Sequence, residues 1–217
     1  MNIINSKNKD NSLNYREEEN IILTIRMILL LIGFSLVFSI IDIGFMLFGI
    51  ADDYSGLFID GSFLIFYLIS YFLCKKGKNR YGRVLFVIVG NFHAGLTALY
   101  FGKGSGAEWH ILEFFLIPML LFSRKDKWFI FSSMILSFSI WMVVQYYNKY
   151  LPSIHKWSPE KLGILYTMNT IFVYIIVAAC MFYFFKAIHN AENNLYKEKL
   201  VSESLLLNIL PKRISDR

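Results

Sequence analysis

Long apolar stretches constrain this chain more than any other feature. About 20 consecutive apolar residues suffice for a helix to cross the hydrocarbon core of a bilayer, and a helix satisfies its own backbone hydrogen bonds there. Of the 217 residues, 56% are hydrophobic, and the mean hydropathy is +0.47, above the values of ordinary soluble domains. The sequence therefore predicts an all-α polytopic membrane protein. Its six transmembrane helices are expected at residues 27–50, 56–74, 84–101, 107–122, 128–147 and 162–188.

The positions of the basic residues predict the orientation. Six spans place both termini on one side of the membrane, and 18 of the 22 Lys and Arg residues then lie on that side. Because cytoplasmic loops are enriched in Lys and Arg, we expect a multi-pass protein of the cell membrane with both termini in the cytoplasm. Residues 1–26 are expected to form a flexible cytoplasmic tail, with an amphipathic helix around residues 15–24 as an alternative. The first apolar run is too long for a signal-peptide core, so we expect it to remain as the first span.

The net charge of +6 does not indicate nucleic-acid binding. The basic residues lie mostly in short loops between apolar runs, which is the placement that membrane topology produces. The two cysteines, Cys74 and Cys180, show neither a pairing pattern nor metal-ligand spacing. The lipid bilayer is therefore the first expected partner.

Ionisable and amide side chains inside the predicted spans are the candidate site residues, because such groups are costly in a membrane. Three interpretations stay open: hydrogen bonds that fix the helix bundle, a pocket for an unknown external ligand, and a metal site. His110 and Glu113 lie on one helical face and suit a transition metal, although no H-E-x-x-H pattern is present. Asp60 and His110 could instead lie at headgroup depth. The candidate ligand-binding residues are Asp42, Asn91, His93, His110 and Glu113.

Two glycines of the third span, Gly90 and Gly95, lack a side chain that would hold a neighbouring helix away. Small residues allow close packing of helices in membranes, although this spacing is not the small-xxx-small pattern. We expect a neighbouring helix to approach the third span closely at these positions.

The sixth span is predicted to continue beyond the membrane. No Gly or Pro interrupts residues 164–210, so one helix of about 70 Å could form at 1.5 Å per residue. A heptad seam that is polar in its middle favours a parallel homodimeric coiled coil whose register can change. The alternative is a marginal amphipathic helix that lies on the membrane or on another domain. The seam consists of Ile188, Ala191, Leu195, Glu198, Ser202, Leu205 and Ile209.

The end of this helix carries the most specific motif of the chain. Residues 202–211 read SESLLLNILP, and Ile214 and Ser215 follow two residues later. This run resembles the signalling helix that enters the catalytic domain of class III adenylate and guanylate cyclases, which reads roughly S-E-x-L-L-x-N-I-L-P, then two residues, Ile and a small residue. The small residue is more often Ala than Ser. The resemblance covers about the last sixteen residues, and metal-dependent serine/threonine phosphatases carry a looser L-L-P run at a similar junction.

The resemblance implies that the chain is the sensor and membrane anchor of an adenylate cyclase. ATP would be converted to cyclic AMP in a catalytic domain that follows residues 189–217, and Mg or Mn would be needed only there. Residues 1–217 would contain no catalytic residue, and the enzyme would act as a homodimer. The implied signal-coupling residues are Leu195, Ser202, Leu205, Asn208, Ile209 and Pro211.

Other functions remain as alternatives. The chain could be the receptor region of a phosphatase, or a small transporter or channel that uses the intramembrane Asp, His and Glu residues. Many transporters are built from internal repeats and contain broken helices, so six spans without either feature give this function little support. An intramembrane hydrolase would need a nucleophile beside a base, and neither His93 nor His110 has an identifiable Ser or Cys partner.

Overall fold

The computed structural model describes residues 2–48, 54–150 and 157–209. Every regular element in these ranges is helical. The chain divides into two compact units, Met1–Ile176 and Val177–Arg217. The elements are α1 (Asn2–Leu47), α2 (Ser55–Lys75), α3 (Asn79–Phe101), the 3-10 turn η1 (Ala107–Trp109), α4 (His110–Leu121), the 3-10 turn η2 (Arg124–Asp126), α5 (Lys127–Tyr150) and α6 (Pro159–Ile209).

The first helix begins earlier than expected. We expected a flexible tail at the N-terminus, but α1 begins at Asn2 and runs without a break into the first apolar stretch. The first glycine of the chain is Gly33, and no proline precedes it. Because nothing interrupts the backbone hydrogen bonds, a helix nucleated by the apolar stretch can extend through the polar residues before it.

Among the described residues, five of the six α-helices are long and apolar enough to cross a membrane: the apolar part of α1 (Ile21–Leu47), α2, α3, α5 and α6. The fourth predicted span, residues 107–122, is helical over residues 107–121 as η1 and α4, but α4 itself has only 12 residues and rises about 18 Å against a hydrocarbon core of about 30 Å. Gly102, Gly104 and Gly106 adopt positive φ angles of 73°, 92° and 75°, which a helix cannot include, so helical structure resumes only at Ala107.

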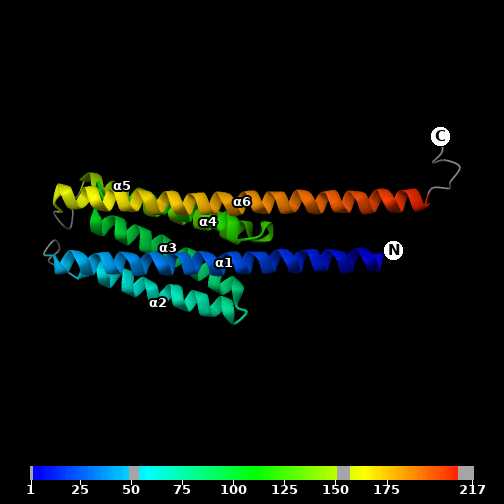
Figure 1. Ribbon diagram of the computed structural model, residues 1–217, viewed down its shortest axis with the longest axis horizontal. Helices are drawn as coiled ribbons and strands as arrows, with labels where there is room; N and C mark the ends of the chain where they lie inside the picture. Colours follow the sequence, from blue (N-terminus) through cyan, green and yellow to red (C-terminus); the bar gives the residue numbers. More distant parts are fainter. Residues whose placement is uncertain (1, 49–53, 151–156, 210–217) are drawn as a thin grey trace. The chain divides into compact units, whose positions relative to one another are not determined.

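Helix α3 lies at the centre of the bundle that residues 2–176 form (Figure 1). It contacts α1, α2, α4 and α5, and 56% of its apolar window is buried, the largest share of any span. The predicted close approach at its glycines is confirmed. A Cβ atom at Gly90 would overlap the Phe114 ring of α4, and one at Gly95 would lie 2.5 Å from Ile140 Cγ2 of α5.

The connections of the bundle meet at two opposite ends. At one end, Arg80 of α3 pairs with Asp126 of η2 at 3.6 Å, and Arg83 Nη1 donates to the carbonyl of Leu121 at 2.9 Å. The basic α2–α3 and α4–α5 connections therefore lie together. At the other end, the Trp157 ring, just before α6, packs against Phe101 at the end of α3.

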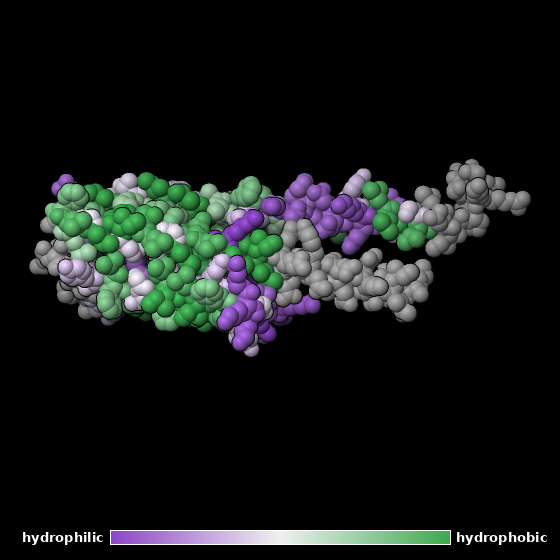
Figure 2. Space-filling view, turned by 60° about the horizontal axis from the view of Figure 1, so that its bottom comes forward, coloured by the Kyte–Doolittle hydropathy of each residue, from purple (hydrophilic) through white to green (hydrophobic). Residues whose placement is uncertain are grey.

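The face of the bundle that Figure 2 shows is predominantly hydrophobic. The exposed large apolar side chains of the bundle include Ile40 and Phe58, which are 67% and 78% exposed. A surface of this kind needs lipid around it rather than water. The protein is thus a multi-pass membrane protein, and lipid is its surrounding partner.

The second unit contains the part of α6 that follows Ile176. The predicted continuous helix is confirmed as far as Ile209. From Ala191 to Leu205 every side chain is exposed, and Leu195 and Leu205 of the predicted seam are 66% and 52% exposed. An ion pair between Lys199 and Glu203 at 3.7 Å supports one turn of the helix.

Among the predicted coupling residues, Leu195, Ser202 and Leu205 lie on this exposed part of α6. Asn208 and Ile209 belong to its last turn. Pro211, with Ile214 and Ser215 of the motif, lies outside the described residues.

Candidate functional site

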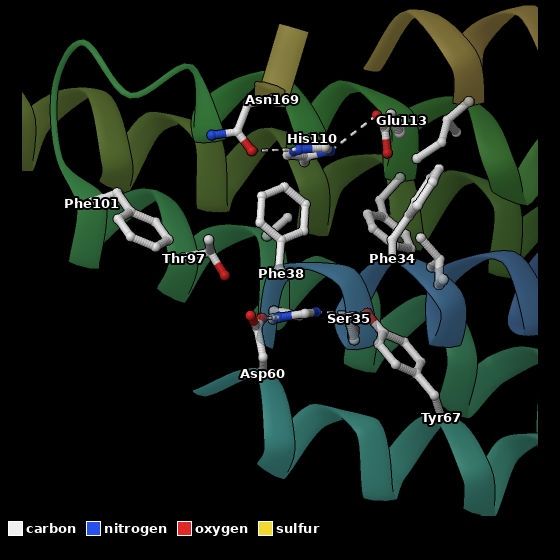
Figure 3. Close-up of a pocket in the computed structure, with 15 residues that line it drawn as sticks. Phe34, Ser35, Phe38, Asp60, Tyr67, Thr97, Phe101, His110, Glu113 and Asn169 are labelled. Atoms are coloured by element: carbon white, nitrogen blue, oxygen red, sulfur yellow. Dashed lines mark hydrogen bonds and ion pairs between the residues drawn. The ribbon is translucent and has the colours of Figure 1, made fainter. Parts of the chain in front are cut away.

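A cavity of about 60 Å³ lies among the helices of the first unit (Figure 3). Residues of α1, α2, α3, α4 and the first part of α6 line it. Its walls combine phenylalanine rings with two clusters of polar side chains. The phenylalanines are Phe34, Phe38, Phe101 and Phe114, and the polar residues are Ser35, Asp60, Tyr67, Thr97, His93, His110, Glu113 and Asn169.

The first polar cluster joins α2 to α3 through His93. The His93 Nε2 atom lies 2.9 Å from Asp60 Oδ1, and its Nδ1 atom lies 3.0 Å from the hydroxyl of Tyr67. When the imidazole is neutral with its proton on Nε2, Nε2 donates to the carboxylate and Nδ1 accepts from the hydroxyl. The Phe63 ring stacks on His93 at 4.5 Å. Both ring nitrogens of His93 thus have partners within the Tyr67–His93–Asp60 cluster.

The second polar cluster joins α4 to α6 through His110. Its Nδ1 atom lies 3.1 Å from Glu113 Oε1, and its Nε2 atom lies 3.2 Å from Asn169 Oδ1. The amide of Asn169 is oriented by a second bond, in which Nδ2 donates to the carbonyl of Ser105 at 2.9 Å. Because Oδ1 then faces the imidazole, His110 Nε2 must be the donor.

The His110–Glu113 contact requires a shared proton. With a proton already on Nε2, a bare Nδ1 would face a carboxylate oxygen, lone pair against lone pair. One proton between Nδ1 and Oε1 removes this repulsion, whether it belongs to an imidazolium or to a carboxylic acid, and the pair has no net charge in either form. The other carboxyl oxygen, Glu113 Oε2, is buried and has no hydrogen-bond partner among the described residues.

The turn before α4 positions this cluster. Gly106 combines a positive φ angle with a close approach, since a Cβ atom there would lie 3.1 Å from Tyr166 Cδ2 of α6. Ser105 Oγ donates to the carbonyl of Gly102 at 2.9 Å and accepts from the amide of Ala107 at 3.3 Å. The turn therefore brings the start of α4 against α6, so that His110 reaches Asn169.

The sequence profile of the MASE7 family matches residues 23–198, which include the whole cavity lining and all but the first two residues of the first candidate span and the last seven of the fifth. The chain belongs to the MASE7 family. MASE7 is a membrane-associated sensor domain, a multi-helix region that serves as the input module of a signalling protein. A comparison with curated proteins gives no match.

The cavity of this MASE7 domain collects three of the five candidate site residues, His93, His110 and Glu113. Asp60 also lines it and is only 7% exposed. Two candidates lie elsewhere. Asp42 packs against Gly56 of α2, where an added Cβ would lie 2.5 Å from its Oδ2 atom. Asn91 is fully buried, and its Nδ2 atom donates to the carbonyl of Val87 within α3.

Sequence reasoning did not single out Tyr67, Thr97, Ser105 and Asn169 as site residues. Asn169 could have been found, since it is an amide within the apolar run of the sixth span. Tyr67 and Thr97 carry no such signal, because hydroxyl residues are common in membrane helices and hydrogen-bond locally. The carbonyl of Ser105 can bind Asn169 only because the glycine turn faces α6. No local sequence pattern predicts which helix a turn will face.

A metal site finds little support in this geometry. In the ranges that the structure describes, no group of three His, Cys, Asp or Glu side chains is arranged to hold a metal ion. Of the two candidate ligands, His110 already uses both ring nitrogens, one toward Glu113 and one toward Asn169. A metal ligand needs a free nitrogen lone pair, so binding would have to break one of these contacts.

Proposed function

We propose that this MASE7 domain is the sensor of a class III adenylate cyclase whose catalytic domain follows Pro211. The observation that carries the proposal is the run SESLLLNILP, residues 202–211, whose first eight residues lie on α6, because it resembles the element through which such cyclases receive their signal. The same helix carries Asn169 of the cavity and Leu205 of the seam. Mg or Mn would serve only the catalytic domain.

The proposal includes six membrane crossings with both termini in the cytoplasm. Although α4 alone is short, η1 and α4 together rise about 24 Å. The contacts of Arg80 with Asp126 and of Arg83 with Leu121 support a full crossing, since they return the chain to the end where α3 begins. The two basic connections then share the cytoplasmic side, as the positive-inside rule requires.

The proposal also includes a homodimer through the second part of α6. The seam residues Leu195 and Leu205 are exposed, and a partner helix would remove their apolar surface from water. Class III cyclases are active as dimers, so the seam would set the arrangement of two catalytic domains. Two dimer registers of different stability would let the membrane part shift the population of the active one.

The test is cyclic AMP production in a cyclase-deficient bacterial host that expresses the native gene to its own stop codon. A Leu205→Asn variant removes one apolar layer of the seam, worth on the order of 2 kcal/mol, and should lower cyclic AMP about tenfold or more. The matched control is Leu200→Asn. Leu200 is exposed and lies on the face of α6 opposite the predicted seam, so this variant should retain near-native output.

Three results would contradict the proposal. Equal cyclic AMP production by Leu205→Asn and Leu200→Asn would show that the seam does not couple the sensor to the cyclase. No cyclic AMP from the native gene, together with phosphatase activity, would assign the sensor to a phosphatase. Ion or solute uptake by reconstituted protein, without any cyclic nucleotide, would indicate a transporter or channel.

A further inference from the structure

We propose that the cavity binds a small cation with N–H donors, ammonium or a short primary alkylammonium ion, and that Glu113 Oε2 accepts a hydrogen bond from it. Asn169 then links occupancy of the cavity to α6. This inference rests on the proposed sensor function and specifies its ligand. Four features of the cavity lead to it: net charge, an open acceptor, aromatic walls and size.

The charge of the lining residues calls for a cation. Two carboxyl side chains, Asp60 and Glu113, line the cavity. With a neutral His93 the Tyr67–His93–Asp60 cluster carries one negative charge, while the proton shared by His110 and Glu113 leaves that pair neutral. None of the lining residues is Lys or Arg. An uncompensated negative charge in a membrane interior is costly, and a monovalent cation in the cavity would neutralise it.

Open hydrogen-bonding atoms indicate a ligand with donors. Glu113 is only 1% exposed, and its Oε2 atom has no partner among the described residues. The Thr97 hydroxyl, which also lines the cavity, is likewise buried without a described partner. A buried acceptor without a donor costs more than a made hydrogen bond contributes. An alkylammonium ion offers three N–H groups to such atoms, whereas a quaternary ammonium ion offers none.

The aromatic walls favour an organic or ammonium ion over a metal ion. Rings of Phe34, Phe38 and Phe101 lie around the cavity (Figure 3), and aromatic faces attract ammonium groups. A divalent metal would need several oxygen or nitrogen ligands in a defined shell. The volume of about 60 Å³ exceeds the roughly 10–15 Å³ that one water molecule needs in a cavity, which suits a ligand of a few non-hydrogen atoms.

His110 provides a physical link from the ligand to α6. A cation at Oε2 favours the carboxylate form of Glu113, so the shared proton resides on His110 Nδ1. The imidazolium then donates more strongly from Nε2 to Asn169 Oδ1, because hydrogen bonds from charged donors are stronger than neutral ones. Occupancy therefore favours the position of α6 in which Asn169 contacts His110, which is the differential affinity that a population shift requires.

The experiment is isothermal titration calorimetry of the full chain in lipid nanodiscs at fixed pH and ionic strength. The probes are methylammonium chloride, tetramethylammonium chloride and sodium chloride. We expect saturable binding of methylammonium, at least about tenfold weaker binding of tetramethylammonium, and no saturable heat with sodium. Comparing the two organic cations on the unaltered chain needs no variant, so it tests the role of the N–H donors even if a variant misfolds.

Two variants locate the binding. Glu113→Gln keeps the shape of the side chain but removes its charge, and should weaken methylammonium binding at least about tenfold. The matched control is Asp42→Asn, a carboxylate of the same bundle that does not line the cavity, and its affinity should stay within about twofold. Absence of saturable methylammonium binding, equal binding of both organic cations, or unchanged binding by Glu113→Gln would each overturn the proposal.

Asn169→Leu tests the link to α6. It should bind methylammonium with lower affinity, because coupling between occupancy and the His110–Asn169 contact is reciprocal. Saturating methylammonium should no longer change cyclic AMP production in membranes that contain the intact enzyme. A response that persists in Asn169→Leu would refute the link. If methylammonium binds but the native gene yields no cyclic nucleotide, the ligand site stands and the cyclase output is wrong. If cyclic AMP depends on Leu205 but methylammonium does not bind, the cyclase output stands and the proposed ligand site is wrong.

Discussion

The two histidine clusters of the cavity differ in what they leave open. His93 connects α2 and α3, which are neighbours in sequence. Its two ring nitrogens contact Tyr67 and Asp60, both of α2. His110 connects α4 to α6 across 59 residues, and its partner Glu113 retains an unpartnered oxygen. A cluster in which both histidine nitrogens and their partners are engaged has the geometry of a contact between helices, whereas a cluster with an open acceptor can also accept a hydrogen bond from a ligand.

This difference bears on two interpretations that the sequence left open. One cavity can contain both interhelical hydrogen bonds and a ligand pocket, because one histidine takes part in the hydrogen bonds and the other lies at the pocket. The cluster of His93 has the geometry of a structural contact, and the cluster of His110 has the geometry of a binding site. Substitutions in the first should change stability more than ligand response, and substitutions in the second should do the opposite.

The largest stability effect is expected for His93→Leu. The substitution leaves Asp60, which is 7% exposed, without its donor, and breaking a buried pair from one side costs about 3–5 kcal/mol. The free energy of unfolding in detergent micelles measures this loss. His189→Leu, an exposed histidine of the second unit, is the control and should cost less than about 0.5 kcal/mol.

A double substitution distinguishes lost pairing from lost packing. In His93→Leu/Asp60→Leu both polar partners are absent, so much of the stability lost in His93→Leu should return. If the double variant is less stable than His93→Leu alone, the Asp60 carboxylate contributes in some way other than through the imidazole, and the cluster is not only a contact between helices.

The sequence predicted the long helices well because apolar length alone determines them. Five predicted spans match helices, and the extension of the sixth follows from the absence of Gly and Pro between residues 164 and 210. The fourth span was predicted within one residue, because the glycine turn before it and the extended Phe122 after it limit its helical residues to 107–121, but its α-helical part is shorter than the other spans. The helix over the residues before Tyr15 was missed because their polar composition resembles that of a tail.

The site was only partly accessible from the sequence. The cost of ionisable groups in a membrane singled out His93, His110 and Glu113, all of which line the cavity. Their pairing was not predictable, because it depends on which helices are neighbours in space. The same criterion selected Asp42 and Asn91, which lie outside the cavity lining, since the cost of burial does not reveal which face of a helix looks into a pocket.

A smaller stability effect is expected for Gly90→Ala, which tests the close approach that sets the cavity width. An added Cβ would overlap the Phe114 ring and push α4 away from α3, and such overpacking costs about 1–3 kcal/mol. Gly61→Ala is the control, because no atom lies within 4 Å of its added Cβ. It should be neutral or stabilising by up to about 1 kcal/mol.

Gly90→Ala should also weaken methylammonium binding, because α4 carries Glu113. A second substitution, Phe114→Leu, gives the added methyl group room and should recover part of the stability. If Gly90→Ala changes neither the stability nor the binding, the spacing of α3 and α4 does not control the cavity, and the two clusters are less coupled than their shared walls indicate.

The smallest effect is expected for Tyr67→Phe, and it sharpens the comparison most. The variant loses one hydrogen bond to His93 Nδ1, worth about 0.5–1.5 kcal/mol, while Tyr71→Phe on the same helix should cost less. In a His93→Leu background the hydroxyl has lost its acceptor, so Tyr67→Phe should cost nothing there, and a double-mutant cycle measures the coupling. Methylammonium affinity should stay within about twofold in Tyr67→Phe. A loss like that of Glu113→Gln would mean that the two clusters act as one network, and the division between a structural and a sensing histidine would fail.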